Sequence, residues 1–245
     1  MSALAIVICG IAGLFVGSLV WNIARNQARK RPLFSPAACC PEGDGELPGA
    51  AWLPFYGFGT ARECPADGNA QPSRRLLFEL AVAFYFGLAA WRLDHWLDLA
   101  AVLTFTLPLL VIFLVDSWTR LIHTNVIALG VLLGIAFGAL DGWRQLLSST
   151  LAMVVATGVF IGFYMIAMLI YRNPKVVPFG VGDVYLAGMI GAMVRLDDIA
   201  RAMVYGVFLA GAAIALLLLL KRVNRKQAVP YGPYLVLGAL ITLVM

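Results

Sequence analysis

Two aspartates at the ends of apolar segments are the residues whose type and position could do chemistry. Asp183 follows two glycines in Gly180-Val181-Gly182-Asp183, at the head of one apolar segment, and Asp116 ends another, Leu99 to Val115. Two nearby carboxylates repel when both are ionised, so such a pair can hold one proton between them. The ionised member can take a proton from water while the protonated member polarises a peptide carbonyl. This pattern predicts hydrolysis by a carboxylate pair, without a metal, a nucleophilic serine or a cofactor.

Gly180 and Gly182 are the candidates for shaping this site. Glycine permits close backbone approach and unusual dihedral angles, so a flexible turn could present a substrate strand to Asp183. The same pattern fits an aspartate that caps the N-terminus of a helix, because its carboxylate accepts from the first free backbone N–H groups. Capping and catalysis are compatible, and both interpretations stay open here.

The composition places the chain in a membrane. Its 245 residues are 62% hydrophobic and only 13% charged, and the mean hydropathy is +0.88. Apolar runs of about 20 residues recur, a length that spans a bilayer core, and in lipid such runs must be helices that satisfy their own backbone. The predicted fold class is an all-α polytopic membrane protein with about eight transmembrane helices. The expected spans are about Ala3–Ile23, Arg75–Trp91, Leu97–Val115, Asn125–Leu140, Leu146–Ile170, Val181–Val194, Ile199–Leu220 and Tyr231–Met245.

The basic residues predict the orientation of these spans. Arg92, Arg144, Arg195 and Arg201 fall on one side, and the other fourteen of the 18 Lys and Arg residues fall on the opposite side. The positive-inside bias makes the richer side cytoplasmic and puts both termini outside. Both aspartates then lie at or near the cytoplasmic face. The net charge of +5 is therefore interpreted as membrane topology, and no nucleic-acid partner is expected.

Three parts follow from this pattern. Residues 1–25 are expected to form the first transmembrane helix, 26–74 a cytoplasmic loop-rich element, and 75–245 a seven-helix membrane domain. The sixth span is short and contains three glycines, so we expect it to be partly buried among other helices.

Several stretches resemble the type IV prepilin peptidases. Asp116–Asn125 resembles their first catalytic motif, and Gly180–Asp183 resembles the second. Pro230-Tyr231-Gly232-Pro233 is similar to their Pro-Phe-Gly-Pro stretch, and Arg75–Leu80 resembles the segment that opens their second span. The resemblance covers nearly the whole chain, and the order and spacing of the motifs make it specific.

The resemblance implies a peptidase in the cytoplasmic (inner) membrane that cuts the short basic leader from prepilins or pseudopilins after a glycine. Asp116 and Asp183 would be the catalytic pair, with Gly180 and Gly182 shaping the approach to Asp183. Glu79 is a candidate for orienting the substrate or pairing with a cationic group. The alternative for Glu79 is a snorkelling or first-turn glutamate that the helix dipole stabilises.

The chain departs from the family pattern at one position near each of the two catalytic motifs. Many members have a lysine where Tyr185 stands, and a proline is usual where His123 stands. Pro230, Gly232 and Pro233 are expected to set the entry into a helix rather than to make contacts.

A further departure concerns cofactors. Many bifunctional members carry two Cys-x-x-Cys pairs in the cytoplasmic stretch and also N-methylate the new N-terminus with S-adenosylmethionine. This chain has Cys39, Cys40 and Cys64 there, and a closed zinc site needs four ligands. We therefore predict no zinc, while S-adenosylmethionine-dependent methylation stays open.

Two other functions compete with this one. A presenilin-type intramembrane protease shares a Gly-x-Gly-Asp element but pairs it with Tyr-Asp and Pro-Ala-Leu, whereas this chain has Val115-Asp116 and no Pro-Ala-Leu. A transporter or assembly subunit with ion-binding carboxylates would place them near the bilayer midplane, whereas both aspartates map to one end. The expected partners are prepilin or pseudopilin substrates and the lipid bilayer, and the sequence gives no oligomeric state.

Overall fold

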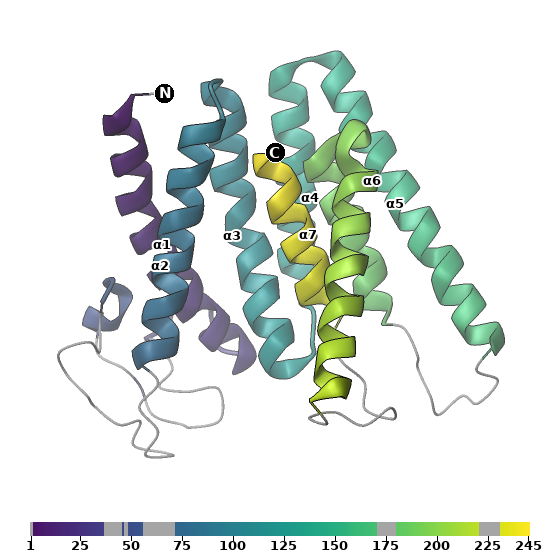
Figure 1. Ribbon diagram of the computed structural model, residues 1–245, viewed down its shortest axis with the longest axis horizontal. Helices are drawn as coiled ribbons and strands as arrows, with labels where there is room; N and C mark the ends of the chain where they lie inside the picture. Colours follow the sequence, from purple (N-terminus) through teal and green to yellow (C-terminus); the bar gives the residue numbers. More distant parts are fainter. Residues whose placement is uncertain (1, 37–45, 47–48, 56–71, 171–179, 221–230) are drawn as a thin grey trace. The chain divides into compact units, whose positions relative to one another are not determined.

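The chain folds as an all-α polytopic membrane protein, which confirms the predicted fold class (Figure 1). The computed structural model describes residues 2–36, 46, 49–55, 72–170, 180–220 and 231–245. The helices in these ranges are α1 Ala3–Ala28, the short 3₁₀ helix η1 Gly49–Trp52, α2 Pro72–Arg92, α3 Trp96–Thr119, α4 Thr124–Asp141, α5 Trp143–Ile170, α6 Val181–Leu219 and α7 Gly232–Val244.

Five of the described helices are long and apolar enough to cross a membrane, namely α1, α3, α4, α5 and α6. α7 is a shorter apolar helix. α2 carries Arg74, Arg75, Glu79 and Arg92 and is not among these five helices.

A break in α6 accounts for the sixth and seventh predicted spans. Arg195 has φ 69° and ψ 173°, in a region that side-chain-bearing residues rarely adopt. Arg195 lies between the sixth and seventh predicted spans. A loop was expected there, but the chain turns at this residue within one continuous helical element. Arg195 makes an ion pair of 2.7 Å with Asp141 at the end of α4, and the Leu196 N–H donates to Oγ of Ser148 in α5 at 2.9 Å. These contacts fix the break against its two neighbours.

The chain divides into two compact units, Met1–Leu103 and Thr104–Leu243. In the first unit, α1 and α2 pack side by side (Figure 1). Their close approach depends on glycine, because a Cβ on Gly13 would lie 2.6 Å from the Cα of Ala83. The predicted division at residues 25 and 74 stays a prediction.

In the second unit, small residues mark where helices cross. A Cβ on Gly134 of α4 would lie 2.7 Å from the carbonyl of Ala192 in α6, and one on Gly191 of α6 would lie 2.5 Å from the carbonyl oxygen of Ala152 in α5. Membrane helices associate through such close packing, because lipid supplies little hydrophobic force between them. The first half of α6 is therefore largely buried, which confirms the expectation for the sixth span.

Gly191 should be among the glycines that tolerate a methyl group least. We expect Gly191→Ala to destabilise the protein by about 1–3 kcal/mol, because the added Cβ meets backbone that cannot rotate away. Gly211→Ala in the same helix is the matched control. A Cβ there meets nothing within 4 Å, and alanine favours helix by up to about 1 kcal/mol. Thermal unfolding in detergent measures both, and equal losses would contradict the packing described.

Candidate functional site

Asp116 and Asp183 come together in the second unit from helices far apart in the sequence. Asp116 lies in the last turn of α3 and is buried, whereas Asp183 lies in the first turn of α6 and is half-buried. The two carboxylates are near enough to interact electrostatically. Arg120, the residue after α3, also acts electrostatically on Asp116. The structure therefore forms the carboxylate pair that the sequence predicts, with a cation beside it.

The start of α6 fixes Asp183 through its own backbone. Gly180 is the N-cap, so Asp183 occupies the third helical position rather than the cap itself. The Asp183 N–H donates to the Gly180 carbonyl at 3.1 Å, and the Asp183 carboxylate accepts from the Gly180 N–H. The bond from the Gly180 N–H to the Asp183 side chain is the half of a capping box that the N3 residue supplies. Asp183 thus stabilises the helix start, although it is not the N-cap aspartate that the pattern also allowed.

The two glycines provide space rather than unusual backbone angles. Gly180 has φ −80° and ψ 136°, an extended conformation open to any residue. A Cβ on it would lie 3.3 Å from Oδ2 of Asp183. A Cβ on Gly182 would lie 3.2 Å from Cδ1 of Ile122, in the connection that follows α3. Gly182 therefore lets the end of α3 approach the start of α6.

The N-terminus of α7 forms a third side of the site. A Cβ on Gly232, the first residue of α7, would lie 2.5 Å from Oδ2 of Asp116 and 3.4 Å from Cδ2 of Leu186. A helix N-terminus favours nearby negative charge. Gly232 begins the helix as expected, and it also lies directly against a candidate carboxylate, a contact that the sequence did not predict. Pro233 occupies the start of the helix as expected, and Pro230 lies outside the described residues.

Tyr231, the N-cap of α7, is a site residue that sequence reasoning missed. Burial, and next the negative charge of Asp183, raise the pKa of Tyr231 above its ordinary value. The phenol is therefore protonated at neutral pH and lies within electrostatic reach of Asp183. The sequence could have pointed to this residue only through its place in Pro230-Tyr231-Gly232-Pro233. That motif does not predict which group the tyrosine side chain contacts.

The two departures from the family motifs lie beside the site. Tyr185 is 50% exposed, and residues two apart on a helix do not share a face, so it does not accompany Asp183. His123 is the N-cap of α4 and makes no capping hydrogen bond with its side chain.

Glu79 lies in the first unit and has a different environment. Its side chain is fully buried, so it is not a snorkelling glutamate. It accepts from Nε of Arg75 at 2.7 Å and from the backbone N–H of Phe55 at 2.9 Å. Glu79 therefore pairs with a cationic group of its own chain, Arg75. Its role in orienting the substrate stays a prediction.

Arg75 and Glu79 belong to a buried polar cluster that holds the segment around η1. Arg75 donates to Oγ of Ser18 at 2.6 Å and to the carbonyl of Ala51 at 2.8 Å. Asn22 donates to the same carbonyl at 2.7 Å. We call Ser18, Asn22, Arg75 and Glu79 the clamp. The clamp satisfies backbone groups of η1 and of the residues that follow it with side chains of α1 and α2.

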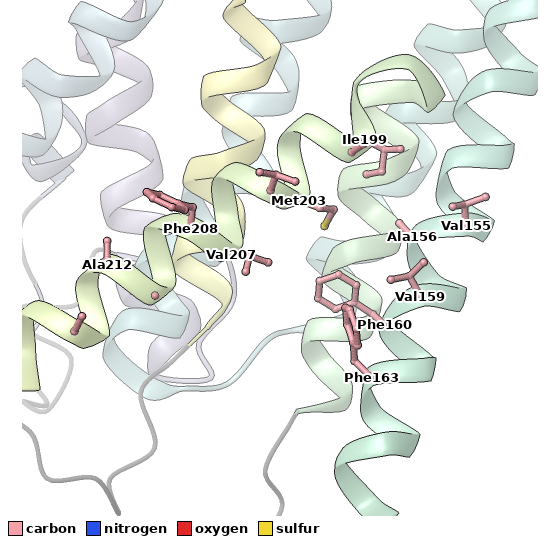
Figure 2. Close-up of a pocket in the computed structure, with 14 residues that line it drawn as sticks. Val155, Ala156, Val159, Phe160, Phe163, Ile199, Met203, Val207, Phe208 and Ala212 are labelled. Carbon is pink, nitrogen blue, oxygen red and sulfur yellow. The ribbon is translucent and has the colours of Figure 1, made fainter.

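An apolar groove of about 810 Å³ lies between α5 and the half of α6 that follows the break. Figure 2 shows side chains of the two helices along it. Its lining includes Phe160 and Phe163 of α5 and Met203, Val207 and Phe208 of α6. All of its lining residues are apolar, so the groove suits hydrocarbon and offers no group for acid–base chemistry.

The described ranges contain no cluster of three or more His, Cys, Asp or Glu residues that could hold a metal. Cys39, Cys40 and Cys64 lie outside the described residues. The expectations about zinc and S-adenosylmethionine therefore stay predictions.

Similarity to a known protein extends along the whole chain. The chain is 22% identical over 271 aligned positions to the prepilin leader peptidase/N-methyltransferase of Stutzerimonas stutzeri, and the alignment covers 98% of this chain and 91% of that protein. No family model matches the chain, and no solved structure matches it. The similarity is distant, but it agrees with the motifs in reaching from the first described helix to the last.

Proposed function

We propose that this chain is an integral-membrane aspartyl endopeptidase that removes the leader of type IV prepilins or pseudopilins, with Asp116 and Asp183 as its catalytic pair. The observation that carries the proposal is the meeting of these two carboxylates at the ends of α3 and α6. The full-length similarity to a prepilin leader peptidase supports the choice of substrate. A pair of carboxyl groups that can share one proton favours direct attack by water.

In the proposed reaction, one water molecule lies between the two carboxyl groups and the scissile carbonyl. The ionised carboxylate takes a proton from this water, and the protonated carboxyl group donates to the carbonyl oxygen. The hydroxide adds to the carbonyl carbon, and the resulting intermediate releases the amine after receiving a proton from the pair. Asp183 is held for this role by its hydrogen bond from Gly180. The chemistry needs neither a metal nor S-adenosylmethionine.

The orientation in the membrane follows from charge. We infer an inner-membrane protein with both termini outside and the site at the cytoplasmic end, because most basic residues flank that end. This position suits a leader that is itself basic and remains on the cytoplasmic side.

Cleavage of a prepilin fusion tests this function. The substrate carries a basic leader, the glycine before the cut and the following apolar segment, joined to a soluble reporter. We expect the purified full-length protein in detergent to release the leader, with or without a chelator and without S-adenosylmethionine. A fusion with a bulky residue in place of that glycine should stay intact.

The Stutzerimonas stutzeri relative serves as the positive control in the same detergent. If that protein cuts the fusion and this chain does not, the proposed function is wrong. Mass spectrometry of the released product treats methylation separately, since one added methyl group that appears only with S-adenosylmethionine would demonstrate the second activity in the relative's name.

A further inference from the structure

We propose that Tyr231 is a positioning residue of the carboxylate pair, whose phenol group orients the Asp183 carboxylate for the attack on the peptide bond. This inference rests on the proposed function and adds a third side chain to its site. It assigns to the start of α7 a chemical task in addition to its packing.

The backbone places Tyr231 beside the Asp116 carboxylate, which itself interacts with Asp183. It directly precedes Gly232, whose Cα lies against the Asp116 carboxylate. The Tyr231 carbonyl accepts from the N–H groups of Tyr234 at 3.1 Å and Leu235 at 3.4 Å, so its main chain is fixed by the first turn of α7. Its half-buried side chain therefore extends from a fixed point at the meeting of three helix ends.

Burial and nearby charge keep the proton on the phenol of Tyr231, so this group can donate a hydrogen bond. The groups that act on this corner are Asp183, Asp116 through its interaction with Asp183, and Arg120 beside Asp116. Since burial and the charge of Asp183 both raise the pKa of Tyr231, the phenol keeps its proton throughout the neutral range. A neutral O–H group can donate to a carboxylate and so favour one orientation of it.

The tyrosine nearest to Asp183 in the sequence, Tyr185, offers no alternative to Tyr231. Tyr185 projects from another side of α6 and is half-exposed, so it does not face the pair. The tyrosine on which the charge of Asp183 acts is instead Tyr231, at the start of α7, where the motif it resembles has phenylalanine. Tyr231 is thus a feature of this chain rather than of the motif it resembles.

Tyr231→Phe removes only the hydroxyl and tests the proposal directly. We expect kcat for leader cleavage to fall about tenfold to a hundredfold, because a misplaced catalytic group loses rate rather than binding. KM should change by less than about twofold, and the pH profile of kcat should shift. Tyr185→Phe, which removes the same group two residues from Asp183, should leave all three unchanged.

A titration makes the test independent of activity. The tyrosinate absorbance of the wild type minus that of Tyr231→Phe gives the ionisation of Tyr231. Asp183→Asn should move this ionisation to lower pH, because a negative charge that raises the pKa of Tyr231 is removed. If the ionisation of Tyr231 occurs at the same pH in Asp183→Asn as in the wild type, the inference is wrong. This result is independent of whether the wild type cuts the leader.

Two further results would also overturn it. The first is a Tyr231→Phe variant whose kcat and pH profile equal those of the wild type. The other is a loss of activity that only follows a loss of thermal stability, with the pH profile unchanged, which would make Tyr231 a packing residue. If the wild type is inactive on the fusion but the titration moves as expected, the peptidase function fails while the contact between Tyr231 and Asp183 stands.

Discussion

Replacing either Asp116 or Asp183 by asparagine should reduce leader cleavage by about a thousandfold or more. An amide has nearly the shape of a carboxyl group, but it can neither take a proton from water nor share one with its partner. General acid and base groups each contribute about 10²–10⁴ in rate, and groups that act as a unit are not additive. The double variant should therefore be little worse than either single one. Initial rates on the prepilin fusion measure all three.

Two control variants separate this effect from a change in fold or charge. Asp98→Asn lies in the first turn of α3 and Asp197→Asn lies in α6 after the break, and both residues are exposed. Each control changes one carboxylate in the same helix as a catalytic candidate, so its activity should stay within about twofold of the wild type. All variants should keep their elution volume and unfolding temperature in detergent. Full activity in Asp116→Asn or Asp183→Asn would end the two-carboxylate mechanism.

Removing the Glu79 side chain should destabilise the protein strongly. In Glu79→Ala the guanidinium of Arg75 remains buried without its counter-charge, and the N–H of Phe55 loses its acceptor. Breaking a buried ion pair from one side costs about 3–5 kcal/mol. Thermal unfolding in detergent should show this loss, together with faster proteolysis in the segment Gly49–Phe55 that the clamp holds.

The exposed pair Arg31–Glu46, at 3.1 Å in the same unit, is the matched control. Exposed ion pairs contribute about 0–1 kcal/mol, so Glu46→Ala should have little effect on unfolding. The double variant Arg75→Met/Glu79→Leu should be more stable than Glu79→Ala, because no unpaired charge remains. If Glu79→Ala unfolds like the wild type, the clamp does not stabilise this unit. If Glu79→Gln unfolds normally but raises KM, Glu79 also orients the substrate.

Much of the fold could be predicted because a bilayer restricts what an apolar run can do. The predicted spans match the described helices to within a few residues, as in Leu97–Val115 against Trp96–Thr119 for α3. The reversal within α6 is the main difference. The charged residues near Arg195 indicated a loop, but one residue with positive φ is enough to turn the chain.

The candidate site could be predicted only in part, for a physical reason. Charge asymmetry placed Asp116 and Asp183 at one end of the spans, and the structure brings them together there. The contribution of α7 had no comparable signal, since the contact of Gly232 with Asp116 arises from packing between helices distant in the chain. The reciprocal hydrogen bonds of Asp183 likewise depend on where α6 begins, and one residue more or less would change the role of the side chain.

The position of α7 beside Asp116 has a consequence for biosynthesis. The ribosome makes α7 after every other described helix, yet its first residues line the proposed carboxylate pair. While α3 and α6 enter the membrane, the pair therefore lacks one side of its enclosure. A nascent chain built in this order would gain the proposed activity only after α7 has inserted.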